Sequence, residues 1–305
     1  MLIWGVFSHV LLPILVMMGA GWLLERRCGL DLATLVRLNI YLFVPAFIFH
    51  QVVASPLSGG ITVRVMLFTA CIVAGMGAMS WIVARIMRYP RAETNALQLA
   101  TMFYNSGNYG VPLMSLAYPG AGPLLQVFVV LTQNVSTFTV GLALAASTNH
   151  RGWRVALPML RQVSLWAVAA ALLVRALHLP VQSWHWFWTP LDYFNSALVG
   201  FALVTLGAQL AKARAVEGFS RLGWALGLRL LGGPLLALAL VPVFGFHGET
   251  AKIMVLSSGF PTAVNTALIA HEFKADEHFA AAAVFYSTLL SMLTVTLLIT
   301  IQRMG

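Results

Sequence analysis

Asn105-Ser-Gly-Asn-Tyr-Gly-Val-Pro112 interrupts one apolar segment of this chain, and Pro261-Thr-Ala-Val-Asn265 interrupts a second segment 156 positions later. In lipid every backbone donor and acceptor needs an internal partner, so a helix broken at membrane depth survives only against protein or beside a water-filled cavity. Breaks at matching places in two halves of a chain are typical of a transporter substrate site. These two stretches therefore decide both the expected fold and the expected function.

The composition around the breaks is that of an integral membrane protein. Of the 305 residues, 60% are hydrophobic and 9% are charged, and the mean hydropathy is +0.85. So few charged groups cannot cover a soluble globule of this size. The net charge of +9 comes from basic residues in short loops, which indicates membrane topology and not a nucleic-acid surface. Cys28 and Cys71 have no metal-binding or redox spacing, so no metal, cofactor or disulfide is predicted.

Ten segments are long enough to cross a bilayer, whose apolar core of about 30 Å requires roughly 20 residues per helix. They are residues 2–24, 33–53, 61–87, 93–119, 122–148, 158–180, 189–209, 217–243, 249–275 and 278–303. Adding about 156 to the bounds of the first five gives the last five, which indicates a duplicated unit. Because each unit has an odd number of spans, the second enters the membrane from the opposite face. We therefore predict an all-α membrane protein of two inverted repeats, residues 1–149 and 150–305.

The orientation follows from the distribution of Lys and Arg between the two sides. One side holds Arg26, Arg27, Arg37, Arg85, Arg88, Arg91, Arg151, Arg154, Arg161, Lys212, Arg214, Arg221 and Lys274. The other side holds Arg64, Arg175, Lys252 and Arg303, while Arg229 falls inside a span. The richer side is expected to be cytoplasmic, so both termini are expected to face outward. The first apolar run is too long for a signal-peptide core and is expected to remain as the first span.

The residue types at the breaks predict unwound backbone that faces an anion. Gly107 and Gly110 allow backbone conformations closed to other residues, and Pro112 and Pro261 disfavour a continuous helix, so the chain is expected to unwind at the breaks. Helix N-termini that meet there present unpaired N–H groups and about half a positive charge each, which suits a carboxylate. No acidic residue falls at mid-membrane, which also favours an anionic substrate.

Polar side chains near the breaks are the candidates for the lining of a substrate cavity. The asparagines of the breaks, Asn105, Asn108 and Asn265, either face a ligand or only satisfy kinked backbone. Gln133 and Asn134 lie in the fifth span, where hydrogen bonding between helices is the alternative to a ligand role. The complete expected site comprises Asn39, Asn105, Gly107, Asn108, Tyr109, Pro112, Gln133, Asn134, Pro261, Thr262 and Asn265.

The breaks also resemble motifs of a known family. The stretch 105–113 resembles the Asn-x-Gly-x-x-Gly-x-Pro-Leu of span four in the auxin efflux carrier family, and 261–265 resembles its span nine. The likeness extends to Asn39 through Pro45-Ala-Phe in span two and to Ser287-Thr288 in span ten, so it covers nearly the whole chain. Asn108 and Tyr109 stand where bacterial members are usually apolar, which leaves the substrate open.

The resemblance implies a carrier of the bile-acid-symporter-like fold in a bacterial inner membrane. In such a carrier spans four and nine cross in a moving transport part, here residues 61–148 and 216–305. The scaffold is residues 1–60 and 158–215, through which a homodimer is expected to form. Plant members export the auxin anion, and bacterial relatives are associated with small carboxylates such as malonate or malate.

Together these observations predict a secondary transporter that moves a small organic anion outward by an elevator-type motion. An inside-negative potential drives anion exit by about 2.3 kcal/mol per charge per 100 mV, so no coupling ion is required. The alternatives are a sodium-coupled importer of the same fold and a membrane receptor that does not transport. An intramembrane enzyme is a third class, for which the sequence has no recognisable catalytic motif.

Overall fold

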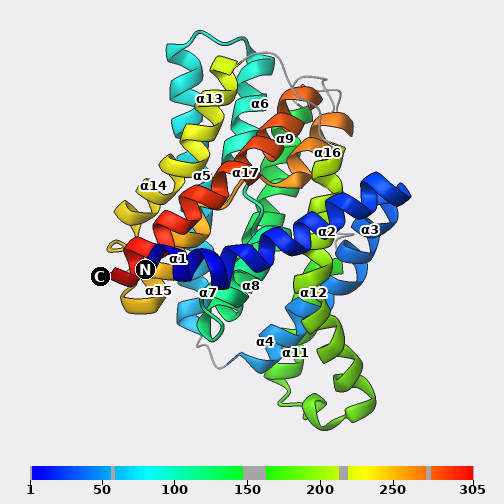
Figure 1. Cartoon of the computed structure of the whole chain (residues 1–305). Helices are drawn as coiled ribbons and strands as arrows, with labels where there is room; N and C mark the ends of the chain where they lie inside the picture. Colours follow the sequence, from blue (N-terminus) through cyan, green and yellow to red (C-terminus); the bar gives the residue numbers. More distant parts are fainter. Residues whose placement is uncertain (1, 56–58, 147–162, 213–218, 273–275, 305) are drawn as a thin grey trace.

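The computed structural model describes residues 2–55, 59–146, 163–212, 219–272 and 276–304, and its regular elements are helices (Figure 1). Seven helical segments among these residues are long and apolar enough to cross a membrane. They are Ile3–Cys28, Leu32–Ala54, Gly59–Ile86, Ala121–Ala145, His185–Ala211, Ser220–Leu240 and His278–Met304. The chain is therefore an all-helical, multi-pass membrane protein, as its composition predicts.

The α-helices follow the expected spans closely along the chain. In order they are α1 (Leu2–Val6), α2 (Leu12–Cys28), α3 (Leu32–Leu38), α4 (Val44–Ala54), α5 (Gly59–Ile86), α6 (Arg91–Met102), α7 (Val111–Ala117), α8 (Ala121–Ser136), α9 (Leu142–Ala146), α11 (Val163–Ala176), α12 (His185–Ala211), α13 (Phe219–Gly227), α14 (Gly233–Leu240), α15 (Gly248–Ser258), α16 (Val264–Glu272) and α17 (Glu277–Met304). The first and last helices contact each other, so the two ends of the described chain lie side by side (Figure 1).

Three of the ten expected spans are not among the seven long apolar helices. Residues 93–119 are divided into α6 and α7, and residues 249–275 are divided into α15 and α16, as the breaks predict. The span expected at 158–180 is described from Val163 onward as the 14-residue α11. The loop 150–158 and the basic residues Arg151, Arg154, Arg161, Arg214 and Lys274 lie outside the described residues.

Wide π-helical turns precede four prolines. The turns are Phe7–Leu11, Asn39–Phe43, Ser106–Gly110 and Leu228–Gly232, and Pro13, Pro45, Pro112 and Pro234 each follow after one intervening residue. Proline lacks an N–H, and its ring crowds the carbonyl four residues earlier, so the preceding turn opens. A fifth π-helical turn, Thr137–Gly141, has no such proline. The sequence thus places most of these local distortions.

The helices α2 and α12 form the closest helix pair of the part expected to be the scaffold. A Cβ added at Gly21 would overlap the carbonyl oxygen of Val204, and one added at Gly207 would overlap that of Met18. Small residues that let backbones approach in this way are typical of helix pairs in membranes. The helices α4 and α11 pack beside this pair, in the lower part of Figure 1.

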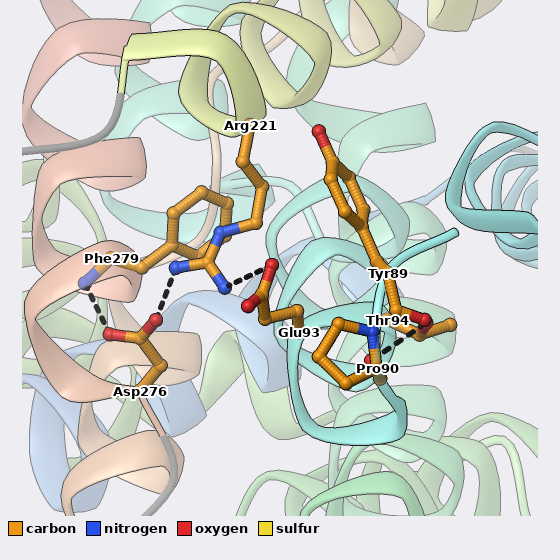
Figure 2. A network of polar contacts seen from close by, with 7 residues as sticks. All are labelled: Tyr89, Pro90, Glu93, Thr94, Arg221, Asp276 and Phe279. Atoms are coloured by element: carbon orange, nitrogen blue, oxygen red, sulfur yellow. Dashed lines mark hydrogen bonds and ion pairs between the residues drawn. The ribbon is translucent and has the colours of Figure 1, made fainter. Parts of the chain in front are cut away.

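One arginine ties three helices together at the expected cytoplasmic end of the other part. Arg221 of α13 lies between Glu93 of α6 and Asp276, which directly precedes α17 (Figure 2). Its Nη1 is 3.5 Å from Glu93 Oε2, and its Nη2 bonds Asp276 Oδ2. The guanidinium carbon also lies 4.1 Å from the ring centroid of Phe279, whose N–H donates to Asp276 Oδ1 at 3.1 Å. The contacts position α6, the helix that leads into the first break.

Candidate functional site

The two breaks lie against each other and share backbone hydrogen bonds. The N–H of Asn105 donates to Pro261 O at 2.8 Å, and the N–H of Ala263 donates to Phe103 O at 2.9 Å. Tyr104 and Thr262 thus form an isolated antiparallel bridge between two helices that are broken at membrane depth. Two of the amides that were expected to face an anion are paired here across the crossing. The bridge explains how the unwound backbone is satisfied, as lipid requires.

Side chains of neighbouring spans complete the pairing at the second break. The N–H of Thr262 donates to Ser287 Oγ at 3.0 Å, and its hydroxyl donates to Ala100 O at 2.8 Å. Thr262 is 1% exposed, so its polar atoms are used for structure. The resemblance to the carrier family singled out Ser287 in span ten, and the structure shows this residue supporting the break.

Gln126 of α8 joins both breaks, although the sequence analysis did not single it out. Its Nε2 donates to Ser106 O at 2.8 Å, and its Oε1 accepts from Ser257 Oγ at 3.1 Å. The side chain is fully buried, so both amide atoms depend on these partners. An amide inside an apolar run was the available signal, but the sequence alone does not show which groups it meets.

The glycines of the first break have a different role from the one expected. Among the described glycines a positive φ occurs only at Gly29, Gly245 and Gly248, and Gly110 has a φ of −69°. The conformational freedom that glycine allows is therefore not used at Gly107 or Gly110. Gly110 is required for close packing, because an added Cβ would lie 2.6 Å from Phe260 Cε2 and 2.7 Å from Gln126 Nε2. At Gly107 an added Cβ would meet nothing within 4 Å.

A cavity of about 90 Å³ lies where the breaks face the expected scaffold. Because one water needs about 10–15 Å³ by this kind of measure, the cavity has room for several waters or a small solute. Its lining includes seven expected site residues, namely Asn39, Asn105, Gly107, Asn108, Gln133, Asn134 and Asn265. It also includes Tyr104, Ser106, Ser164 and Gln209, and none of the described lining residues is charged.

The other four expected site residues, Tyr109, Pro112, Pro261 and Thr262, do not line this cavity. Tyr109 is fully buried, accepts a hydrogen bond from Ser291 Oγ at 3.1 Å and packs its ring edge-to-face with Phe260 at 5.6 Å. These contacts hold the first break against the last helix. These four residues therefore contribute to the packing of the crossing, while the asparagines line the cavity.

The cavity is bordered by buried amide atoms that have no hydrogen-bond partner among the described residues. They are Asn39 Oδ1, Asn105 Nδ2, Gln133 Nε2 and Oε1, and Gln209 Oε1. An unsatisfied buried polar group costs about 1–3 kcal/mol, so several at one place indicate a site that binds water or a polar solute. Asn39 also donates to Asn108 Oδ1 at 2.7 Å, which links the second span directly to the first break.

Comparison with known proteins identifies the family. The model of a family described as membrane transport proteins matches residues 6–156 and 159–299. The chain belongs to this membrane transport protein family. It is the family of the auxin efflux carriers, which the motifs at the breaks resemble.

Two relatives are similar over almost their whole length. An uncharacterised transporter of Methanothermobacter thermautotrophicus is 26% identical over 295 residues, which cover 95% of this chain and 96% of the relative. A proposed malonate transporter of Rhizobium meliloti (strain 1021) is 25% identical over 316 residues, which cover 98% of this chain and 96% of the relative. Membership of this transporter family and the multi-pass helical fold agree.

Proposed function

We propose that this protein is a secondary transporter of small organic carboxylates, with its binding site in the cavity between the two breaks and the second span. The observation that carries the proposal is the group of unpaired amide atoms on that cavity, with Asn105 Nδ2 as a donor at the crossing itself. Two of these atoms, Asn105 Nδ2 and Gln133 Nε2, are donors from which a carboxylate accepts hydrogen bonds, whereas the amide oxygens can only accept. A relative that is a proposed malonate transporter supports this substrate class.

The mechanism that we propose is alternating access by an elevator-type motion. The cavity is lined on one side by Asn39 and Gln209 of the expected scaffold and on the other by residues of both breaks. A movement of the break-bearing part past the scaffold would carry the site across the membrane, and the Asn39–Asn108 hydrogen bond would have to open during that movement. Ten crossings in two inverted repeats provide the frame, since inverted repeats and broken helices at the midplane occur together in carriers.

The proposed setting is a bacterial inner membrane, with both termini outside and a homodimer formed through the scaffold. An inside-negative potential would then drive the anion outward without a coupling ion. Among the described basic residues, Arg26, Arg27 and Arg221 lie at the ends of spans that this orientation places in the cytoplasm, which supports it.

Flux measurements in liposomes test the proposal. Purified protein is reconstituted, and uptake of labelled malonate, malate and a monocarboxylate is measured against an imposed membrane potential. Replacement of Asn105 by alanine removes the unpaired donor and is expected to lower carboxylate flux at low substrate concentration by about 5- to 150-fold, as the loss of about 1–3 kcal/mol of binding implies. The folded fraction should stay close to wild type, because Asn105 Nδ2 has no hydrogen-bond partner in the described part of the chain.

The matched control is Asn195→Ala. Asn195 also carries a partly buried amide, but that amide accepts from Gln51 Nε2 at 3.2 Å and does not line the cavity. Unchanged flux in the Asn105 variant would remove this residue from the site. Flux that requires an inward sodium gradient would point instead to a symporter, and ligand-dependent stabilisation without any flux would point to a receptor.

A further inference from the structure

Arg229 is a buried cation at the point where the two breaks begin. It lies in the π-helical turn Leu228–Gly232 within an expected membrane span, and none of its surface is exposed. Its Nη1 donates to Thr101 O at 2.5 Å, and its Nη2 donates to Ser258 O. Thr101 lies in the last turn of α6, and Ser258 is the last residue of α15. A single guanidinium therefore joins the C-terminal ends of both broken helices.

The electrostatics of these helix ends account for a cation in this position. The last carbonyl groups of a helix lack internal partners and carry about half a negative charge together. In the described part of the chain no carboxylate forms an ion pair with Arg229, although burying a lone charge is costly. Its other close partner is the ring of Tyr104, whose centroid is 5.0 Å from the guanidinium carbon.

The neighbouring sequence makes room for the guanidinium. A Cβ added at Gly233 would overlap both Arg229 Nη2 and Ser258 O, so the contact exists only because glycine follows the π-helical turn. At the adjacent Gly232 an added Cβ would meet the flexible end of Met79 at 3.2 Å. Gly233 is therefore required for the position of the Arg229 guanidinium, and Gly232 is not.

We propose that Arg229 is a built-in cation that takes the place of a bound monovalent metal ion at the crossing. Carbonyl oxygens at the ends of broken helices are typical sodium ligands in transporters, and here the guanidinium occupies that position. The helix ends stay neutralised throughout the cycle, so no inorganic cation is needed to hold them together. The consequence for coupling rests on the proposed function: carboxylate flux does not depend on sodium.

A stability measurement tests the cation site without any substrate. Wild type, Arg229→Gln and Arg229→Lys are unfolded thermally in detergent, in NaCl and in N-methyl-D-glucamine chloride at equal ionic strength. The Tm of wild type should be the same in the two salts, and so should the Tm of Arg229→Lys, because each protein carries its own fixed positive charge at position 229. The Gln variant should unfold earlier in N-methyl-D-glucamine, and sodium should raise its Tm saturably by about 2–4 °C near ten times Kd.

The glycine pair supplies matched variants. Gly233→Ala displaces both the guanidinium and the proposed ligand Ser258 O, so it should lower the Tm in both salts without a sodium response, whereas Gly232→Ala should unfold like wild type. A wild type that is itself stabilised by sodium, or a Gln variant that shows no sodium response, would overturn the proposal. If the Gln variant does not fold in either salt, Arg229→Lys decides: a folded, sodium-insensitive protein supports the proposal, and an unfolded or sodium-stabilised one refutes it.

Flux separates this inference from the proposed function. Wild-type protein that transports no carboxylate would refute the proposed function, while the salt response of Arg229→Gln would still decide the cation site. Wild-type flux that is equal in sodium and N-methyl-D-glucamine, together with variant flux that is restored by sodium, would support both. Wild-type flux that requires sodium would overturn the built-in cation and the uncoupled export, while transport of carboxylates would still stand.

Discussion

Replacing Gly110 with alanine is expected to destabilise the crossing, while the same change at Gly107, three positions earlier, is not. The new methyl at position 110 would lie 2.6 Å from Phe260 Cε2 and 2.7 Å from Gln126 Nε2. Phe260 cannot move away easily, because it is fully buried and its ring packs against Tyr109 and Tyr104 at centroid distances of 5.6 and 6.3 Å. The clash must be relieved largely by displacing Gln126.

The magnitude follows from three contributions. Overpacking of a buried site costs about 1–3 kcal/mol. Displacement of Gln126 weakens its bonds to Ser106 and Ser257, each worth about 0.5–1.5 kcal/mol. The greater helix propensity of alanine offsets about 1 kcal/mol of this cost. Gly110→Ala should therefore lower the free energy of unfolding by about 1–5 kcal/mol.

Unfolding by SDS in mixed micelles measures this free energy for both glycine variants. Gly107→Ala should be as stable as wild type or more stable by up to about 1 kcal/mol, because its methyl enters the open cavity. That methyl should nevertheless reduce carboxylate flux, so the two variants separate packing from ligand binding. The reasoning fails if Gly110→Ala stays within about 0.5 kcal/mol of wild type, the range of an ordinary surface substitution.

Two further predictions concern the helices that hold the site. Gly207→Ala should separate α2 from α12 and lower the unfolding temperature, because its Cβ would overlap Met18 O. At Gly200 an added Cβ would meet nothing within 4 Å, so Gly200→Ala should be neutral. Equal stability of the two variants in thermal unfolding would contradict the close packing. Asp276→Ala should lower the free energy of unfolding by about 1 kcal/mol, because this residue both caps α17 and pairs with Arg221. Glu93→Ala should lower it by less than about 0.5 kcal/mol, because its partner Arg221 is 3.5 Å away and the Glu93 side chain is 42% exposed. A larger loss for Glu93→Ala than for Asp276→Ala in SDS unfolding would refute this ranking.

Much of the fold could be predicted because its determinants are local. Apolar length predicts the spans, and Pro45, Pro112 and Pro234 place π-helical turns where the ring crowds the turn before it. The breaks were predicted from Asn, Gly and Pro content, but the preceding helices end at Met102 and Ser258, each three positions before the first residue of its break. The residues in between lead into the bridge between the breaks, which joins positions far apart in the chain and is not visible in the local sequence.

The candidate site was predicted only in part. The asparagines and Gln133 could be named as polar groups within spans, and the structure places them on one cavity. Tyr109 and Thr262 looked equally suitable in the sequence, yet their polar atoms are used by Ser291, Ser287 and Ala100. Polarity at membrane depth shows that a group needs a partner, but it does not show whether that partner is protein or ligand.

The sequence by itself determined that this protein folds in a lipid bilayer, where its helices break and to which family it belongs. These follow from apolar length, from the missing N–H of proline and from short motifs, all of which are encoded within a few neighbouring residues. Only the tertiary structure decided that the breaks pair with each other, that Gln126 joins them and that Arg229 reaches the ends of two helices. Those contacts join residues far apart in the chain, such as Arg229 and Thr101, and arise only when packing brings the spans together.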